Sequence, residues 1–301
     1  MKIALGTVQL GIKYGLANTH GQPTRDESFS ILDLALSKGI DTFDTAWAYG
    51  EAEDVLGEWI ENKSLRGKVK IISKMKPHSL NDYPDGTKSS EIIEKEISKS
   101  LNRLKLDYLD GYLFHSPYYV YMSHVLESLK KAKDKGLVRN IGVSIYDESE
   151  ALQAINSGID YIQIPYNVFD QRLDTTDFFE IVKKNKVKVF ARSPFLQGVL
   201  LMKPDELPSN LSYLKPYLEK FISISLKYNL SQKEAALAFV CSIPNIDYIV
   251  FGVETVEQLS QNIDIVKNLK VNDDFIKEIR DSFKDLNKGA INPSLWTKLK
   301  K

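Results

Sequence analysis

Short apolar runs alternate along the chain with longer segments in which apolar residues recur every three or four positions. Such a run predicts a buried β-strand, and the recurrence predicts an amphipathic helix. Eight strand–helix pairs follow one another from residue 3 to residue 269. The expected strands cover residues 3–7, 40–46, 69–74, 108–115, 138–144, 161–167, 187–193 and 248–252. The expected helices cover residues 27–39, 53–62, 89–105, 124–136, 149–158, 177–186, 231–243 and 255–269.

This alternation predicts a parallel sheet, and eight repeats predict that the sheet closes into a (β/α)8 barrel of the TIM type. No linker or low-complexity stretch divides the chain, so we expect one domain over residues 1–301. The long segment 194–229 interrupts the rhythm with several prolines and an extra helix. A capping box from Ser231 to Glu234 should open the next helix. A C-terminal helix and a tail are expected after Leu269.

Composition excludes several classes of protein. Forty basic and forty acidic side chains give a formal net charge of zero, so no nucleic-acid surface is expected. The single cysteine, Cys241, permits no internal disulfide. No run approaches the roughly 18 apolar residues of a membrane span, and the first residues lack the apolar region of a signal peptide. We therefore expect a cytoplasmic protein, and nothing in the sequence indicates its oligomeric state.

Four reactive side chains occur at the ends of early strands. Asp44, Lys74 and His115 each end an apolar run, and Tyr49 follows Asp44 by one short turn. The C-terminal ends of barrel strands meet at one face, and the active site of such a barrel lies there. An acid, an amine, a phenol and an imidazole gathered at that face suit proton transfer to a carbonyl oxygen. Each residue alone has an ordinary structural explanation, but their coincidence favours an active site.

Elementary chemistry assigns a role to each of the four. A nearby ammonium group stabilises a phenolate, so Lys74 is expected to lower the pKa of Tyr49 and make it a proton donor near neutral pH. Asp44 would pair with Lys74 and keep it charged. A neutral His115 would donate a hydrogen bond to the substrate carbonyl. The other three histidines lack the spacing of metal ligands, so no metal site is expected.

The segment FDTAWAYG, which carries Asp44 and Tyr49, resembles a signature of the aldo-keto reductases, nicotinamide-dependent enzymes built on a (β/α)8 barrel. Lys74 and His115 stand at the matching strand ends, and the resemblance covers nearly the whole chain. It implies an enzyme that reduces an aldehyde or a ketone to an alcohol by hydride transfer, with Tyr49 as the proton donor. The expected binding partner of such an enzyme is its substrate, a small carbonyl compound.

The resemblance also implies a cofactor, NADP(H) or NAD(H), that lies extended across the barrel mouth. Ser144 and Gln163 would hold the carboxamide of the nicotinamide. Arg192 stands where many members place a tyrosine that stacks on the nicotinamide ring, and a guanidinium plane can stack in the same way. The residues expected at the cofactor are Gly6, Thr7, Asp44, Ser144, Gln163, Arg192, Ser193, Leu196, Gly198, Gly252, Glu254, Gln258, Gln261 and Asn262.

The choice between the two cofactors stays open. Members that prefer NADPH commonly carry a basic residue in the loop that opens the last barrel helix, where it pairs with the 2′-phosphate. Residues 252–262 contain no Arg or Lys, and Glu254 would repel that phosphate. The loop therefore favours NADH, whereas the family as a whole leans towards NADPH.

The residues expected at the substrate are His115, Trp47 and Trp296. Because Pro293 interrupts a helix, the tail should be non-helical. It would either fold over the barrel mouth, with Trp296 near Tyr49 or Trp47, or cover an apolar patch on the outer helices. A polar and aromatic rim would suit a sugar or another hydroxylated carbonyl compound. The candidate rim residues are Tyr14, Trp47, Asn81, Tyr83, Tyr118, Tyr119 and Tyr121.

Two other functions fit parts of this pattern. Some relatives of the aldo-keto reductases are accessory subunits of channels, so a non-catalytic nicotinamide-binding accessory or sensor subunit is one alternative. The intact set of four reactive residues argues against it. A different barrel enzyme could use Lys74 as a Schiff-base amine. Pairing with Asp44 would keep that lysine charged and make it a poor nucleophile.

Overall fold

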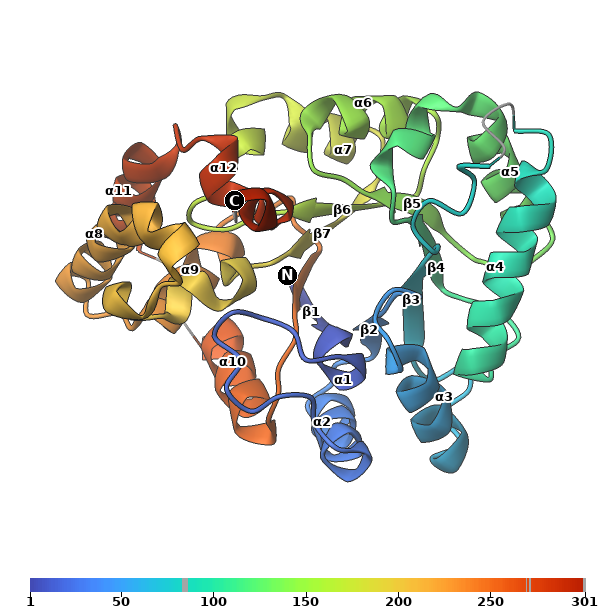
Figure 1. The fold of residues 1–301 in the computed structure, drawn as a ribbon, viewed down its shortest axis with the longest axis horizontal. Helices are drawn as coiled ribbons and strands as arrows, with labels where there is room; N and C mark the ends of the chain where they lie inside the picture. The colour runs from blue at the N-terminus through green and yellow to red at the C-terminus, as the bar shows by residue number, and fades with distance from the viewer. Residues whose placement is uncertain (83–85, 269, 271, 300–301) are drawn as a thin grey trace.

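The computed structural model describes residues 1–82, 86–268, 270 and 272–299. Its strands close into a barrel in the order of the sequence, and every neighbouring pair is parallel (Figure 1). The expected (β/α)8 barrel is confirmed. The strands are β1 (Lys2–Gly6), β2 (Thr42–Asp44), β3 (Lys70–Lys74), β4 (Gly111–Phe114), β5 (Ile141–Ser144), β6 (Tyr161–Pro165), β7 (Lys188–Arg192) and β8 (Tyr248–Phe251).

Helices form a ring around the barrel, with α8 and α11 packed together outside it (Figure 1). The α-helices are α1 (Val8–Gly11), α2 (Arg25–Ser37), α3 (Ala52–Asn62), α4 (Ser89–Leu104), α5 (Ser123–Asp134), α6 (Glu148–Asn156), α7 (Phe178–Lys184), α8 (Lys215–Lys227), α9 (Gln232–Cys241), α10 (Val256–Asn268), α11 (Asp273–Phe283) and α12 (Lys288–Ile291). The 3-10 helices are η1 (Pro117–Tyr121), η2 (Arg172–Thr175), η3 (Leu196–Leu201), η4 (Pro204–Glu206), η5 (Ser209–Leu214) and η6 (Pro293–Leu299). In the part of the chain that is described, no helix is both long and apolar enough to cross a membrane.

The C-terminal third of the chain contains three local features expected from the sequence. The extra helix after the seventh strand is α8, and the C-terminal helix is α11. The expected capping box is present at the start of α9, where the Ser231 side chain accepts from the Glu234 amide and the Glu234 carboxylate accepts from the Ser231 amide. The expectation of a non-helical tail is wrong, because residues 293–299 form η6. Proline is tolerated in the first turn of a helix, so Pro293 can begin this one.

Side chains alternate between the two faces of each barrel strand, as β geometry requires. Inside the barrel, Ala4, Ile72, Leu113, Phe190 and Val250 pack with Tyr248 into a small apolar cluster. Each of these first five residues is followed two positions later by a residue at the C-terminal mouth of the barrel. The residues at the mouth are, in the same order, Gly6, Lys74, His115, Arg192 and Gly252. The apolar cluster therefore closes the barrel beneath the mouth, and the polar residues lie above it.

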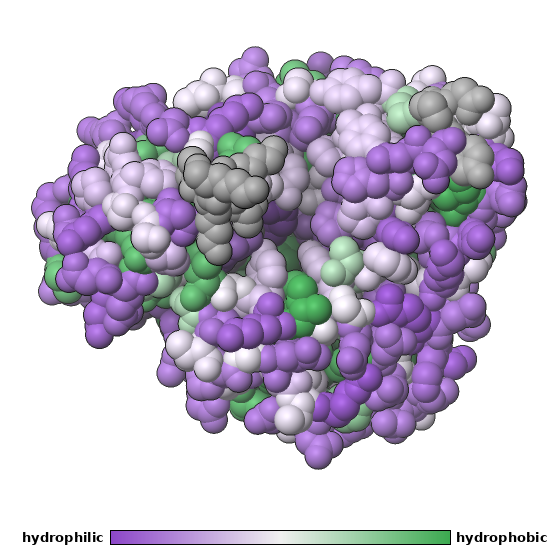
Figure 2. Space-filling model, viewed as in Figure 1, coloured by the Kyte–Doolittle hydropathy of each residue, from purple (hydrophilic) through white to green (hydrophobic). Residues whose placement is uncertain are grey.

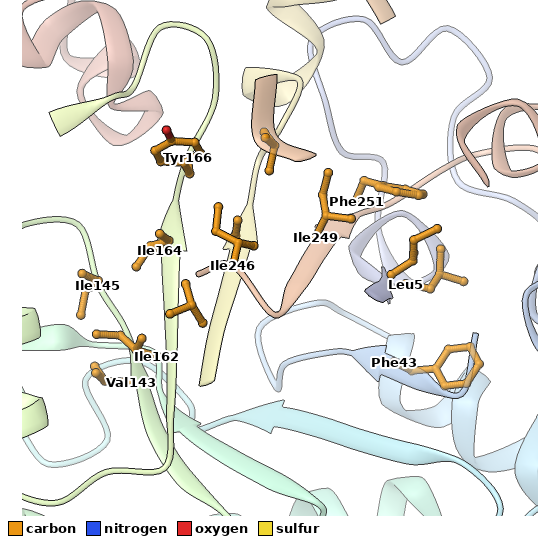
Figure 3. Packing of buried hydrophobic residues seen from close by; sticks show 14 of the residues in the cluster. Leu5, Phe43, Val143, Ile145, Ile162, Ile164, Tyr166, Ile246, Ile249 and Phe251 are labelled. Carbon is orange, nitrogen blue, oxygen red and sulfur yellow. The ribbon is translucent and has the colours of Figure 1, made fainter. Parts of the chain in front are cut away.

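A second and larger apolar core lies between the outer faces of the strands and the helices. Figure 3 shows Val143 and Ile145 beside Ile162 and Ile164 of the next strand, all within this core. Phe43 belongs to the same core and meets the ring of Trp59 on α3 edge-on, with centroids 5.3 Å apart. These contacts hold the strands in register, and with them the positions of the residues at the barrel mouth.

Candidate active site

A cleft of about 350 Å³ lies at the C-terminal end of the barrel. Figure 2 views the molecule towards this end of the barrel and shows a hollow near the middle of the surface. The cleft takes in the strand-end residues of the inner face together with residues from the loops after β1, β2, β5, β7 and β8. Those strand-end residues are Gly6, Asp44, His115, Ser144, Gln163, Arg192 and Gly252.

Lys74 lies under this cleft and makes three contacts. Its Nζ donates to Asp44 Oδ1 at 2.7 Å, to the carbonyl oxygen of Thr45 at 2.9 Å and to the Tyr49 hydroxyl at 3.3 Å. Both charged side chains are buried, with residue exposures of 0 % for Lys74 and 3 % for Asp44. The second Asp44 oxygen accepts from Gln163 Nε2 at 2.7 Å. The three donors of the ammonium group are thus all used, and one of them is directed at the phenol.

Close backbone packing fixes the loop that carries Tyr49. Gly50 has a positive φ of 58°, a conformation that glycine adopts without strain. A Cβ atom at Gly50 would lie 2.4 Å from the Gly11 carbonyl oxygen, and one at Gly11 would lie 1.8 Å from the Tyr49 carbonyl oxygen. The short helix α1 therefore contacts the Tyr49 loop directly, and these two glycines make that contact possible.

The effect of Lys74 on Tyr49 differs from the sequence-based expectation. Burial is the main cause that raises the pKa of Tyr49, and the Asp44 carboxylate raises it further. Arg192 acts in the opposite direction and does not compensate. The expected fall of this pKa towards neutrality is therefore wrong. The physical reason is that Asp44 offsets the charge of Lys74 at 2.7 Å, while burial disfavours the phenolate.

His115 is held as a neutral imidazole. Burial lowers its pKa to about 3, and the positive charges of Lys74 and Arg192 lower it as well. Its ring meets that of Tyr49 edge-on, with centroids 6.1 Å apart and an angle of 90° between the planes. Its Nδ1 is buried without a hydrogen-bond partner among the residues described. The imidazole and the phenol thus stand side by side as neutral hydrogen-bonding groups.

One wall of the cleft is formed by the ends of β5, β6 and β7. Ser144 and Gln163 are register partners on adjacent strands. Arg192 Nε donates to Ser144 Oγ at 3.4 Å, and Arg192 Nη2 donates to the Ile145 carbonyl oxygen at 3.3 Å. The Oε1 atom of Gln163 is buried without a partner in the described part of the protein. This wall therefore offers an unused amide acceptor beside a hydroxyl group and a guanidinium group.

The far end of the cleft lies where β8 leads into α10. Glu254, Gln258 and Asn262 line it, and Gln258 Oε1 accepts from the Glu254 amide at 2.9 Å. Lys233 of α9 also lines this end, and its Nζ donates to Gln261 Oε1 at 2.6 Å. A basic side chain is therefore present at this end, although it comes from a helix outside residues 252–262.

Most of the residues expected from the sequence line this one cleft. They are Gly6, Thr7, Asp44, Tyr49, His115, Ser144, Gln163, Arg192, Ser193, Gly198, Gly252, Glu254, Gln258 and Asn262. Lys74 lies beneath them and reaches Tyr49. Leu196, Gln261, Trp47 and Trp296 are outside the lining. Leu196 is buried, Gln261 contacts Lys233, and Trp47 lies under Lys76 Nζ, which is 4.6 Å from its ring centroid.

The structure places Trp296 within the C-terminal tail. Its indole N–H donates to the Gly289 carbonyl oxygen at 2.9 Å, its own carbonyl oxygen accepts from Asn210 Nδ2 at 3.1 Å, and the residue is only 4 % exposed. The tail is also tied to the loop after β5, because Lys288 Nζ donates to Asp147 Oδ1 at 2.8 Å. The tail thus reaches the C-terminal side of the barrel, but the indole N–H of Trp296 is bonded within the tail and its backbone is bonded to η5.

The cleft also contains residues that the sequence did not single out as site residues. They are Val8, Gln9, Gly15, Ala17, Asn18, Tyr146, Pro194, Phe195, Gln197, Leu201, Lys233, Val250 and Phe251.

Tyr14, expected only in the rim, lies in the cleft, and its hydroxyl accepts from Gln197 Nε2 at 3.0 Å. Tyr118 and Asn81 contact each other through their side chains outside the cleft lining. Tyr83 lies outside the described residues. Across the ranges that the structure covers, no group of three or more potential metal ligands is found.

The chain is similar to known proteins over most of its length. A model of the Aldo/keto reductase family matches residues 2–283. The chain is 26 % identical over 299 residues to the uncharacterized oxidoreductase YqkF of Bacillus subtilis, covering 93 % of this chain and 95 % of that protein. It is 24 % identical over 292 residues to a protein of Escherichia coli named NADH-specific methylglyoxal reductase, covering 87 % of this chain and 88 % of that protein.

Solved structures show the same fold. The aldo-keto reductase AKR11C1 from Bacillus halodurans, in its holo form, superposes with a TM-score of 0.78 at 21 % identity, covering 97 % of this chain and 95 % of that one. The thermostable aldo-keto reductase Tm1743 superposes with a TM-score of 0.71 at 24 % identity, covering 93 % and 94 %. At these identities the likeness concerns the fold.

Proposed function

This chain belongs to the Aldo/keto reductase family, and we propose that it reduces a small aldehyde or ketone to an alcohol with a hydride from NADPH or NADH. The observation that carries the proposal is the buried ion pair of Lys74 and Asp44, which directs one ammonium hydrogen at the Tyr49 hydroxyl. A neutral His115 lies beside that hydroxyl in the same cleft. These groups can receive a carbonyl oxygen and protonate it.

The residues of the cleft fit a nicotinamide dinucleotide. Three buried side-chain oxygens of residues that line this cleft lack a partner within the described residues: Gln163 Oε1, Gln9 Oε1 and Asn262 Oδ1. Buried amide oxygens need donors, and the carboxamide and adenine amino groups of the dinucleotide can provide them. Ser144 and Gln163 would hold the nicotinamide end, and Gln258 and Asn262 the adenosine end. When bound, the dinucleotide would supply the hydride.

The protein's own contribution is orientation and a proton. Tyr49 would donate its hydroxyl proton to the carbonyl oxygen as the negative charge develops there. Lys74 holds the Tyr49 hydroxyl in place, and its ammonium charge stabilises the phenolate left after transfer. His115 would donate a second hydrogen bond and position the carbonyl group. Asp44 keeps Lys74 oriented and compensates its buried charge.

The alternatives named from the sequence have less support. A Schiff-base lysine needs a free amine, but all three donors of Lys74 are used, by Asp44, Thr45 and Tyr49. An accessory or sensor subunit has no need for the Lys74–Tyr49 contact. The relative named as a methylglyoxal reductase supports a small aldehyde as substrate. A sugar-like substrate and a cytoplasmic location stay predictions.

The proposal is tested by carbonyl-dependent oxidation of NADPH and NADH. Purified protein should oxidise at least one of them when an aldehyde from a panel of small dicarbonyls, sugars and aromatic aldehydes is added. Binding of both dinucleotides should be titrated in parallel by fluorescence. Binding without turnover on any carbonyl would favour the accessory or sensor subunit instead.

Reduction should depend little on pH between about 5 and about 9. Because burial and Asp44 raise the pKa of Tyr49, the phenol keeps its proton over this range. His115, whose pKa is lowered to about 3, stays neutral over the same range. Alcohol oxidation needs the phenolate as base, so its kcat should rise with pH. The measurement is kcat against pH in both directions, and a fall in reduction centred near pH 7 would contradict the raised pKa.

Cofactor choice should depend on two opposite charges at the adenosine end. Lys233 would attract the 2′-phosphate of NADPH, and Glu254 would repel it. Lys233→Gln should therefore raise the ratio of the NADPH Kd to the NADH Kd by about tenfold, or about 1.4 kcal/mol. Glu254→Gln should lower the same ratio. Lys233→Arg keeps the charge and serves as the matched control; an unchanged ratio in Lys233→Gln would show that the phosphate lies elsewhere.

A further inference from the structure

Arg192 is the unbalanced charge at the catalytic end of the cleft. Lys74 and Asp44 form an ion pair and offset each other. Tyr49 is a neutral phenol and His115 a neutral imidazole, given the directions of their pKa shifts. The Arg192 guanidinium contacts a hydroxyl oxygen and a carbonyl oxygen, and among the described residues no carboxylate forms an ion pair with it. The catalytic end therefore carries a net positive charge.

The Arg192 side chain is also held in place along the cleft wall. Its Cζ atom lies 4.7 Å from the centroid of the Tyr146 ring, and its two hydrogen bonds reach the end of β5. It contacts Ser144, one of the two residues that would hold the nicotinamide carboxamide. A group seated against Ser144 and Gln163 must therefore lie close to this guanidinium.

The field of Arg192 already acts on the reacting groups. Burial is the main cause of the lowered pKa of Lys74 and His115 and of the raised pKa of Tyr49; the Arg192 charge adds to the lowering at Lys74 and His115 and opposes the rise at Tyr49. These three side chains come from three different parts of the barrel. The field therefore extends across the catalytic end and acts on any charge that develops there.

The two redox forms of a nicotinamide differ by one positive charge at the ring, since the oxidised ring is cationic and the reduced ring is neutral. We propose that Arg192 makes this site bind the reduced dinucleotide more tightly than the oxidised one, and so favours carbonyl reduction and release of the oxidised product. This inference rests on the proposed function, because it needs a nicotinamide at the catalytic end. An uncharged side chain at the end of β7 would give no such preference.

The test is a binding measurement that needs no turnover. Kd values for NADH, NAD+, NADPH and NADP+ are measured by calorimetry at one ionic strength, because charge effects are screened by salt. The wild-type ratio of the oxidised to the reduced Kd should be about tenfold or more, and Arg192→Gln should lower it by about tenfold. Arg192→Lys keeps the charge and should retain most of the ratio. Lys130→Gln, which removes an exposed charge on α5, is the control for net charge.

The outcomes separate this inference from the proposed function. A wild-type protein that binds the oxidised form as tightly as the reduced form overturns the inference, whatever the variants do. An Arg192→Gln ratio within about twofold of the wild-type ratio also overturns it. A wild-type protein that binds none of the four dinucleotides overturns the proposed function, and the inference with it.

Discussion

Replacing Tyr49 by phenylalanine should lower kcat for carbonyl reduction by roughly 10²–10⁴-fold, the usual range for losing a general acid. The change removes only the hydroxyl oxygen that accepts from Lys74 Nζ at 3.3 Å, and it keeps the ring that meets His115 edge-on. Affinity for the dinucleotide should change little, because the residues proposed to hold it lie elsewhere in the cleft. The measurement is kcat with an aldehyde substrate together with the Kd for NADH and NADPH.

One result with Tyr49→Phe would contradict the proposed role of Tyr49 as the proton donor. If Tyr49→Phe reduces aldehydes at a near-normal rate, Tyr49 is not the proton donor. Tyr14→Phe is the matched control, because Tyr14 is also a tyrosine of the cleft and its hydroxyl contacts Gln197 rather than Lys74. Its kcat should fall far less than that of Tyr49→Phe.

Lys74→Met should have the second large effect, a loss of reduction of about 10³-fold or more, since the charge that stabilises the phenolate disappears. Methionine has nearly the length of lysine, so the packing is largely kept. The change also leaves Asp44 buried without its counter-ion. Removing one partner of a buried pair costs about 3–5 kcal/mol, so the free energy of unfolding should fall by that amount. Activity is measured under conditions where circular dichroism shows the variant folded.

A double variant separates the two consequences. Asp44→Asn combined with Lys74→Met removes both charges, and the asparagine oxygen can still accept from Gln163 Nε2. Its free energy of unfolding should recover much of the loss seen in Lys74→Met, because no buried charge is left unpaired. Its activity should stay as low as that of the single variant. Recovery of activity along with stability would mean that the lysine charge has no role in the reaction.

The positions of the four reactive residues could be predicted because they depend on local patterns. Asp44, Lys74 and His115 each follow an apolar run, and parallel strands bring their C-terminal ends to one face. Tyr49 is near Asp44 in the chain and reaches Lys74 across one turn. The strand bounds were less predictable, since β2 covers only Thr42–Asp44 within the apolar run 40–46.

Residues that reach the cleft from distant segments could not be predicted. Lys233 belongs to α9, a helix whose sequence pattern says nothing about a contact with Gln261 on α10. Gln9 lies on α1, whose four residues are too few to show a helical period. Trp296 is apolar, and its pattern predicts burial but not the partners that bury it.

The direction of the pKa shift of Tyr49 could not be predicted from the sequence, for a different reason. Charges can be read from a sequence, but their balance depends on distance and burial. The sequence places a lysine near the phenol, whereas the structure adds Asp44 at 2.7 Å from that lysine and surrounds the phenol with protein. Burial and the carboxylate then outweigh the lysine, so the direction of the shift reverses.

Transfer of deuterium is the sharpest test of hydride transfer from the dinucleotide to the carbonyl carbon. NADH and NADPH deuterated at the transferable position of the nicotinamide are mixed with the protein and an aldehyde that it reduces, in ordinary water. We expect an alcohol with one deuterium on the carbinol carbon, and a hydroxyl proton that comes from Tyr49 and exchanges with solvent. An alcohol whose carbinol carbon takes its new hydrogen from water, or a protein that transfers no deuterium to any carbonyl compound, would contradict it.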